Sequence, residues 1–135
     1  MKPAVIALVA CGLLAGPAVA GLPLLEAMKQ VVDPAANAFW AAGNDPPEGE
    51  SSEAADARWR AAGEGASTIE AYGRRLMSAE HSRAGEWNAF ARMMVEAGAA
   101  GRAAVEQRGM DGAFAAGGQL YEACAGCHAS YIPGR

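Results

Sequence analysis

Hydrophobic residues recur every three or four positions over four long segments of this chain, and no segment alternates with the period of two typical of a half-buried strand. The first segment covers 22–42 and has its apolar side chains on one face of an α-helix. Pro34 lacks a backbone donor, so the helix is expected to kink there and to continue in phase. The predicted apolar stripe is Leu24, Leu25, Met28, Val31, Val32, Ala35, Phe39 and Ala42.

The second predicted helix follows a turn-rich break at 43–49 and extends to about residue 79. Ser51 or Ser52 can cap its first turn, where Glu53 complements the helix dipole. Its apolar positions are four and three residues apart in alternation, the seam of a helix bundle. This stripe is Ala55, Trp59, Ala62, Ala66, Ile69, Gly73 and Leu76.

The third predicted helix begins near Trp87 and stops at Arg108 and Gly109. The fourth runs from about Asp111 and is closed by Pro133-Gly134. Short loops between four helices predict an all-α fold, an antiparallel up-down-up-down four-helix bundle. The third stripe is Trp87, Phe90, Ala91, Met94, Ala97, Gly98, Gly101 and Val105. The fourth stripe is Phe114, Gly117, Tyr121, Cys124, His128 and Tyr131.

The first twenty residues follow a different pattern. Lys2 precedes an apolar run that ends in Ala-Val-Ala at Ala20, which is typical of a cleavable secretory signal peptide. The run is shorter than the about 20 residues that a membrane-spanning helix needs. Cleavage after Ala20 would leave residues 21–135 as one domain in the periplasm. The alternative is a lipoprotein anchored through an acylated Cys11.

Composition narrows the function classes. The chain has 135 residues, of which 52% are hydrophobic and 19% charged, as expected for one globular domain without a membrane span. Its formal net charge of −4 lacks the basic excess that nucleic-acid binding requires, so nucleic acid is not an expected partner. Three cysteines are too few for a disulfide framework.

The candidate chemistry lies in the fourth predicted helix, as Cys124-Ala125-Gly126-Cys127-His128, the attachment sequence of a c-type haem. Both thiols and the imidazole fall within little more than one helical turn, so the sulfurs can form thioethers with the haem vinyl groups while His128 reaches the iron. Ala125 and Gly126 would leave space for the porphyrin edge. A redox-active or structural disulfide and half of a zinc site are the alternatives, although no βαβ pattern or second Cys/His pair accompanies them.

The small residues on the stripes support the same interpretation. Helices that face each other with many Ala and Gly residues would leave voids or come too close together. A porphyrin would fill such space. Haem is therefore expected to form part of the core.

An exported four-helix chain that ends in Tyr121-Glu122-Ala123-Cys124-Ala125-Gly126-Cys127-His128-Ala129-Ser130-Tyr131 resembles the class II c-type cytochromes, the cytochrome c′ family. The architecture covers residues 21–135, but only the motif is specific. Class I cytochromes c carry the motif near the N-terminus and a methionine after it, and no methionine follows His128 here. The resemblance implies one covalent haem c on Cys124 and Cys127, with His128 as the proximal iron ligand.

The resemblance also places the first helix across the distal side of the haem. A methionine there fills the sixth iron position, whereas an apolar side chain leaves it open. Met28 lies on the predicted stripe and is the candidate distal ligand, and the alternative is that it only fills the core. Met93 and Met94 are weaker candidates. Family members often have an arginine near the haem propionates one turn earlier, where this chain has Leu24, which leaves Lys29 as a substitute.

These residues predict a periplasmic one-electron carrier that is not an enzyme, with periplasmic redox proteins as partners. The resemblance also allows a homodimer. An open sixth position would instead favour a binder of nitric oxide or carbon monoxide, or a haem enzyme acting on peroxide. Peroxide chemistry needs a distal acid-base group, and the first helix offers only Glu26 and Asp33.

Overall fold

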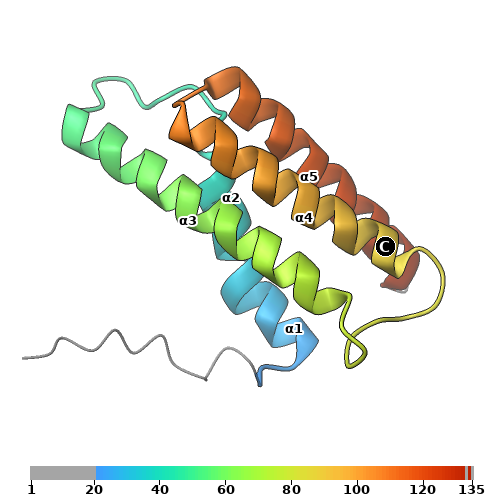
Figure 1. The fold of residues 1–135 in the computed structure, drawn as a ribbon. Helices are drawn as coiled ribbons and strands as arrows, with labels where there is room; N and C mark the ends of the chain where they lie inside the picture. Colours follow the sequence, from blue (N-terminus) through green and yellow to red (C-terminus); the bar gives the residue numbers. More distant parts are fainter. Residues whose placement is uncertain (1–20, 133, 135) are drawn as a thin grey trace, which may run out of the picture.

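The computed structural model describes residues 21–132 and 134, and this part of the chain is all-α, as predicted (Figure 1). Each of four helices packs against the next, which is consistent with an up-down bundle. The predicted signal peptide and Cys11 lie outside the described residues. None of the helices described has the combination of length and apolar character that a membrane span requires. The elements are α1 (Leu24–Ala27), η2 (Met28–Val32), α2 (Asp33–Trp40), α3 (Ser52–Leu76), α4 (Trp87–Glu106) and α5 (Met110–Tyr131).

The first helix consists of α1, η2 and α2 and contains a π-helical turn just before the proline. In η2 the hydrogen bonds span five residues, and the Asp33 N–H donates to the Met28 carbonyl. Pro34 has no N–H to offer the Gln30 carbonyl, and its ring would crowd that carbonyl in a regular α-helix. The wider turn accommodates both effects. The helix therefore continues through Pro34 as predicted, but its irregularity precedes the proline.

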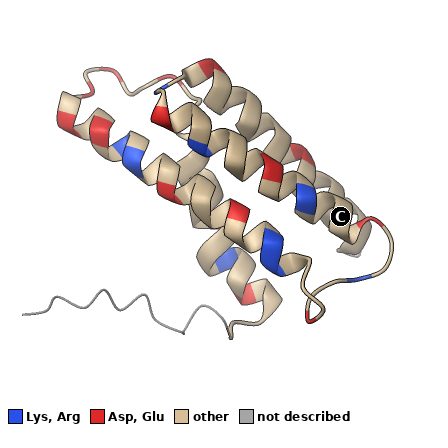
Figure 2. Ribbon diagram, in the orientation of Figure 1, with Lys and Arg blue, Asp and Glu red and all other residues tan. Residues whose placement is uncertain are grey.

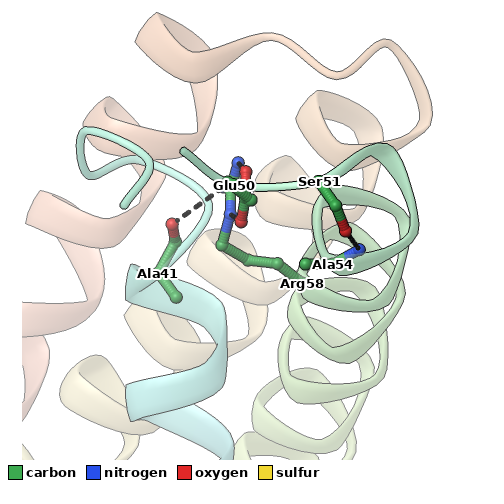
Figure 3. Close-up of polar contacts among 5 residues, drawn as sticks. All are labelled: Ala41, Glu50, Ser51, Ala54 and Arg58. Carbon is green, nitrogen blue, oxygen red and sulfur yellow. Dashed lines mark hydrogen bonds and ion pairs between the residues drawn. The ribbon is translucent and has the colours of Figure 1, made fainter. Parts of the chain in front are cut away.

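The start of α3 is as predicted. Ser51 is the N-cap, and its Oγ accepts a hydrogen bond from the Ala54 N–H at 3.2 Å (Figure 3). The helix ends at Leu76, three residues before the predicted end, and passes into turns. The buried positions reproduce the predicted stripe from Trp59 onward and add Gly65 and Tyr72.

The C-terminal end of α4 differs from the prediction in the residue that adopts the left-handed conformation. Arg108, rather than Gly109, adopts the left-handed conformation, with φ of 48°. The Gly109 N–H then donates to the Ala104 carbonyl at 2.9 Å and satisfies a terminal carbonyl of the helix. The Arg108 guanidinium also pairs with Asp56 on α3, which gives this strained residue a contact across the bundle.

A half-buried ion pair joins the break at 43–50 to the start of α3 (Figure 3). The Arg58 Nε donates to one Glu50 carboxylate oxygen at 2.8 Å, and its Nη2 donates to the other at 3.0 Å. The Arg58 Nη1 donates to the Ala41 carbonyl at 3.1 Å. The two side chains are only 15% and 11% exposed. This two-pronged contact ties the end of the first helix to α3.

The helices approach one another at glycines. A Cβ built on Gly98 of α4 would lie 2.7 Å from the Ala66 carbonyl oxygen of α3, and one on Gly73 would lie 2.8 Å from the Ala91 oxygen of α4. A Cβ on Gly65 would collide with the Ala35 carbonyl of α2. Of the two predicted consequences of small residues, voids or a very close approach of the helices, the structure has the close approach on these faces.

The buried face of α5 also differs from the predicted stripe. Phe114 and Tyr121 are 69% and 61% exposed, and Leu25 on the first helix is 64% exposed. Because α5 is apolar on more than one face, close packing selects the face with the small side chains. The buried residues of α5 are Ala113, Ala116, Gly117, Leu120 and Ala123.

We expect Gly98→Ala to lower the free energy of unfolding by about 1–3 kcal/mol, because the α3 backbone must move to admit the methyl group. Gly118→Ala is the matched control, since a Cβ there has nothing within 4 Å. It should raise the free energy of unfolding by about 0.5–1 kcal/mol, the ordinary gain of alanine over glycine in a helix. Urea unfolding measures both. Equal effects of the two substitutions would contradict the close packing.

We expect Arg58→Ala to lower Tm by about 5 °C, since Glu50 and the Ala41 carbonyl lose their partner. The exposed neighbour Arg60 provides the control, and Arg60→Ala should leave Tm nearly unchanged. The hydrogen bonds from Arg58 hold the pKa of Glu50 below its ordinary value. The stabilisation is therefore present at neutral pH and is lost as the pH falls through that lowered pKa. Thermal melts should show the gap between the wild type and Arg58→Ala narrowing below about pH 4, with the part due to the Ala41 carbonyl remaining.

Candidate functional site

The three residues of the C-x-x-C-H motif lie on the C-terminal part of α5. Cys124, Cys127 and His128 are spaced i, i+3 and i+4, so their side chains lie on neighbouring positions of one helical face. All three are half-buried. The helix continues beyond them to Tyr131, and the Ile132 N–H donates to the His128 carbonyl at 3.0 Å. The motif is thus held in regular helix on both sides.

The opposite side of the motif packs against α4. A Cβ on Gly126 would lie 2.9 Å from Cζ of Phe90, so this glycine admits the phenyl ring. In this structure the space beside Gly126 is filled by Phe90. One turn further on, the rings of Tyr131 and Trp87 meet edge to face at a centroid distance of 5.1 Å, and the Tyr131 hydroxyl donates to the Ala84 carbonyl at 2.7 Å. These contacts fix the rotation of α5 about its axis.

Cys124 and Cys127 are free thiols in the structure and pack against the main core cluster. Burial raises the pKa of both thiols, and the charge of Arg83 only partly opposes this effect at Cys127. A redox-active cysteine pair instead needs a lowered pKa, which a helix N-terminus supplies. This pair lies near the C-terminal end of α5. The environment does not favour a thioredoxin-like function.

A zinc site lacks further ligands in the part of the chain that the structure describes. There, no group of three or more His, Cys, Asp or Glu side chains is arranged to hold a metal ion. A structural zinc site normally has four such ligands. The motif itself offers two thiols and one imidazole.

Counted along the two helices from their contact at Trp40 and Gly117, Met28 is expected near the level of His128. The Trp40 Nε1 donates to the Gly117 carbonyl at 2.9 Å, and this contact gives a reference point on both helices. Met28 is twelve residues before Trp40, and His128 is eleven residues after Gly117. The wider turn of η2 contains one extra residue, so twelve residues of the first helix cover about the same length as eleven residues of α5.

A second contact gives the same register. A Cβ on Gly43, in the turn after α2, would lie 2.7 Å from the Phe114 Cα of α5. Both residues are three positions from the first pair. Met28 is half-buried and packs against the same core cluster as the two cysteines. It is also the first residue of the π turn, and such turns occur frequently at functional sites.

The other methionines are less well placed. Met93 and Met94 belong to or pack against the same cluster. The contacts between α4 and α5 join Phe90 to Gly126, which puts these methionines opposite about residues 122 and 123, a turn or more before His128. Met110 packs against a separate cluster around Trp59. Position along the bundle therefore favours Met28.

An exposed apolar stripe leads to the motif along α5. Phe114, Tyr121 and His128 are seven residues apart and so lie on one face of the helix. The two aromatic side chains are mostly exposed, whereas His128 is half-buried. A flat apolar group held by His128 and the cysteines would lie beside this stripe.

Tyr72 of α3 is a residue that the sequence stripe omitted. Its side chain is 4% exposed, and its hydroxyl has no hydrogen-bond partner among the described residues. It belongs to the core cluster against which Met28, Cys124 and Cys127 pack. Its spacing of three residues from Ile69 could have indicated its burial, but nothing in the sequence indicates an unpaired hydroxyl.

Comparison of the chain with protein-family models, with curated protein sequences and with solved structures gave no match. The interpretation of the site therefore depends on its residues alone. Two thiols and an imidazole on one helical face, a thioether at the same level on another helix and an adjoining apolar stripe fit the requirements of a covalently held haem.

Proposed function

We propose that this protein is an exported c-type cytochrome that transfers single electrons. Cys124 and Cys127 would hold one haem c through thioether bonds, and His128 would be its proximal iron ligand. The haem, when bound, supplies an iron that changes between the ferric and ferrous states. The observation that carries the proposal is the C-x-x-C-H motif on one face of α5, with Met28 at the level of His128 on the first helix.

The chain's own residues would set the geometry of this centre. Phe90 and Trp87 of α4 hold the C-terminal part of α5 in place, so the thiols and the imidazole have a fixed direction. Met28 would offer a soft thioether from the opposite side, and its position follows from the π turn. A His/Met pair raises the reduction potential and closes the iron to gases.

The surface near the motif suits a brief contact with a redox partner. Charged residues are spread along α3 and α4, whereas α5 carries only Asp111 and Glu122 (Figure 2). Electron-transfer encounters are weak and bury less than about 1,200 Å². We propose that the partners are periplasmic redox proteins, reached after export and cleavage at Ala20, and that the protein can form a homodimer.

We expect the protein exported in a host with haem-attachment machinery to carry one covalent haem. Intact mass spectrometry under denaturing conditions should show the added mass, because thioether bonds survive unfolding. The double substitution Cys124→Ser and Cys127→Ser should abolish that addition. Material that contains only a Cys124–Cys127 disulfide would overturn the proposal.

We expect the wild type to have a low-spin ferrous spectrum with sharp α and β bands and to bind carbon monoxide slowly. Met28→Leu conserves volume but removes the thioether, so it should give a five-coordinate iron, rapid carbon monoxide binding and a lower potential. Met93→Leu is the matched control and should behave as the wild type. If the wild type already binds carbon monoxide rapidly and Met28→Leu changes nothing, then Met28 fills the core and gas binding replaces electron transfer as the function.

A further inference from the structure

The Tyr72 hydroxyl is a buried hydrogen-bond donor that no described residue satisfies. Buried polar groups in proteins nearly always have a partner, so an unpaired one points to a ligand or a bound molecule. Burial also raises the pKa of Tyr72, although the charge of Arg75 partly opposes this. The hydroxyl therefore keeps its proton at neutral pH and can donate it in a hydrogen bond.

Tyr72 lies on α3 at about the level of the π turn of the first helix. Two turns earlier on the same face of α3, a Cβ on Gly65 would lie 3.1 Å from the Phe39 backbone nitrogen of α2. Tyr72 is seven residues after Gly65. Because α3 and the first helix are antiparallel, its level corresponds to about seven residues before Phe39, at the end of η2 (Met28–Val32). The hydroxyl thus belongs to the side of the bundle where the thioether and the motif come to one level.

A guanidinium packs over the ring that carries this hydroxyl. The Arg75 Cζ lies 5.8 Å from the centroid of the Tyr72 ring, one turn further along α3. A neutral donor beside a guanidinium is suited to bind a carboxylate. On the first helix, Lys29 has an exposed side chain and lies 3.9 Å from the Glu26 carboxylate.

We propose that the Tyr72 hydroxyl donates a hydrogen bond to a propionate carboxylate of the haem, with Arg75 supplying the balancing charge. This inference rests on the proposed function, because it requires the haem. The propionates are the two carboxylates that a haem brings into a site, and they are acceptors only. Tyr72 is thus a positioning residue, which orients the haem from α3 while the cysteines hold its opposite edge.

The test is the pH dependence of the reduction potential of the haem-loaded protein. The potential falls as a propionate loses its proton, since the negative charge favours the ferric state. A hydrogen bond to the carboxylate holds its pKa down, so Tyr72→Phe should move this fall to higher pH by about one to two units. Arg75→Gln should move it in the same direction.

The chain offers two matched controls on α3. Thr68→Val removes a hydroxyl that is already bonded to the Glu64 carbonyl, and Arg74→Gln removes an exposed charge that is paired with Glu70. Neither should move the pH at which the potential falls, which separates loss of a propionate contact from a general structural effect.

The outcomes separate the two proposals. If mass spectrometry finds no covalent haem, the cytochrome function fails and this inference fails with it. If haem is attached but Tyr72→Phe and Arg75→Gln have the wild-type pH dependence, the propionate contact is overturned while the cytochrome function stands. A shift in both variants, with neither control affected, supports the contact.

Discussion

The close approach of helix backbones at glycines is the constraint on which the rest of this structure depends. Gly65 admits the α2 backbone to α3, and Gly73 and Gly98 bring α3 and α4 together. A helix packed this closely cannot slide along its neighbour without a collision between backbones. The axial level of each helix is therefore determined, and with it the levels of Tyr72 on α3 and Met28 on the first helix.

The position of α5 follows from different contacts at its two ends. Near its start, Gly117 accepts a hydrogen bond from Trp40 of the first helix. Near its end, Gly126 and Tyr131 pack against α4. Between these anchors, Cys124 lies on a helix whose rotation is set by two neighbours. Groups held this rigidly can position a covalent ligand without further reorganisation.

Burial gives the site a consistent chemical character. It raises the pKa of both thiols and of the Tyr72 hydroxyl, so all three groups are neutral at physiological pH. Neutral thiols near a helix C-terminus are poorly suited to disulfide exchange. Together with the Met28 thioether, they form a soft, mostly apolar surrounding in which an iron porphyrin would keep a high potential.

The sequence by itself determined the four helices, the Ser51 cap and the placement of the C-x-x-C-H motif on one helical face, because periodicity, capping and i, i+3, i+4 spacing are local properties. Only the tertiary structure decided that Phe114 and Tyr121 face outward, that Gly126 makes room for Phe90 and that the Tyr72 hydroxyl has no partner among the described residues. An alanine-rich helix is apolar on several faces, so hydrophobicity cannot choose among them. The choice comes from how closely a neighbouring backbone can approach, which no local pattern contains.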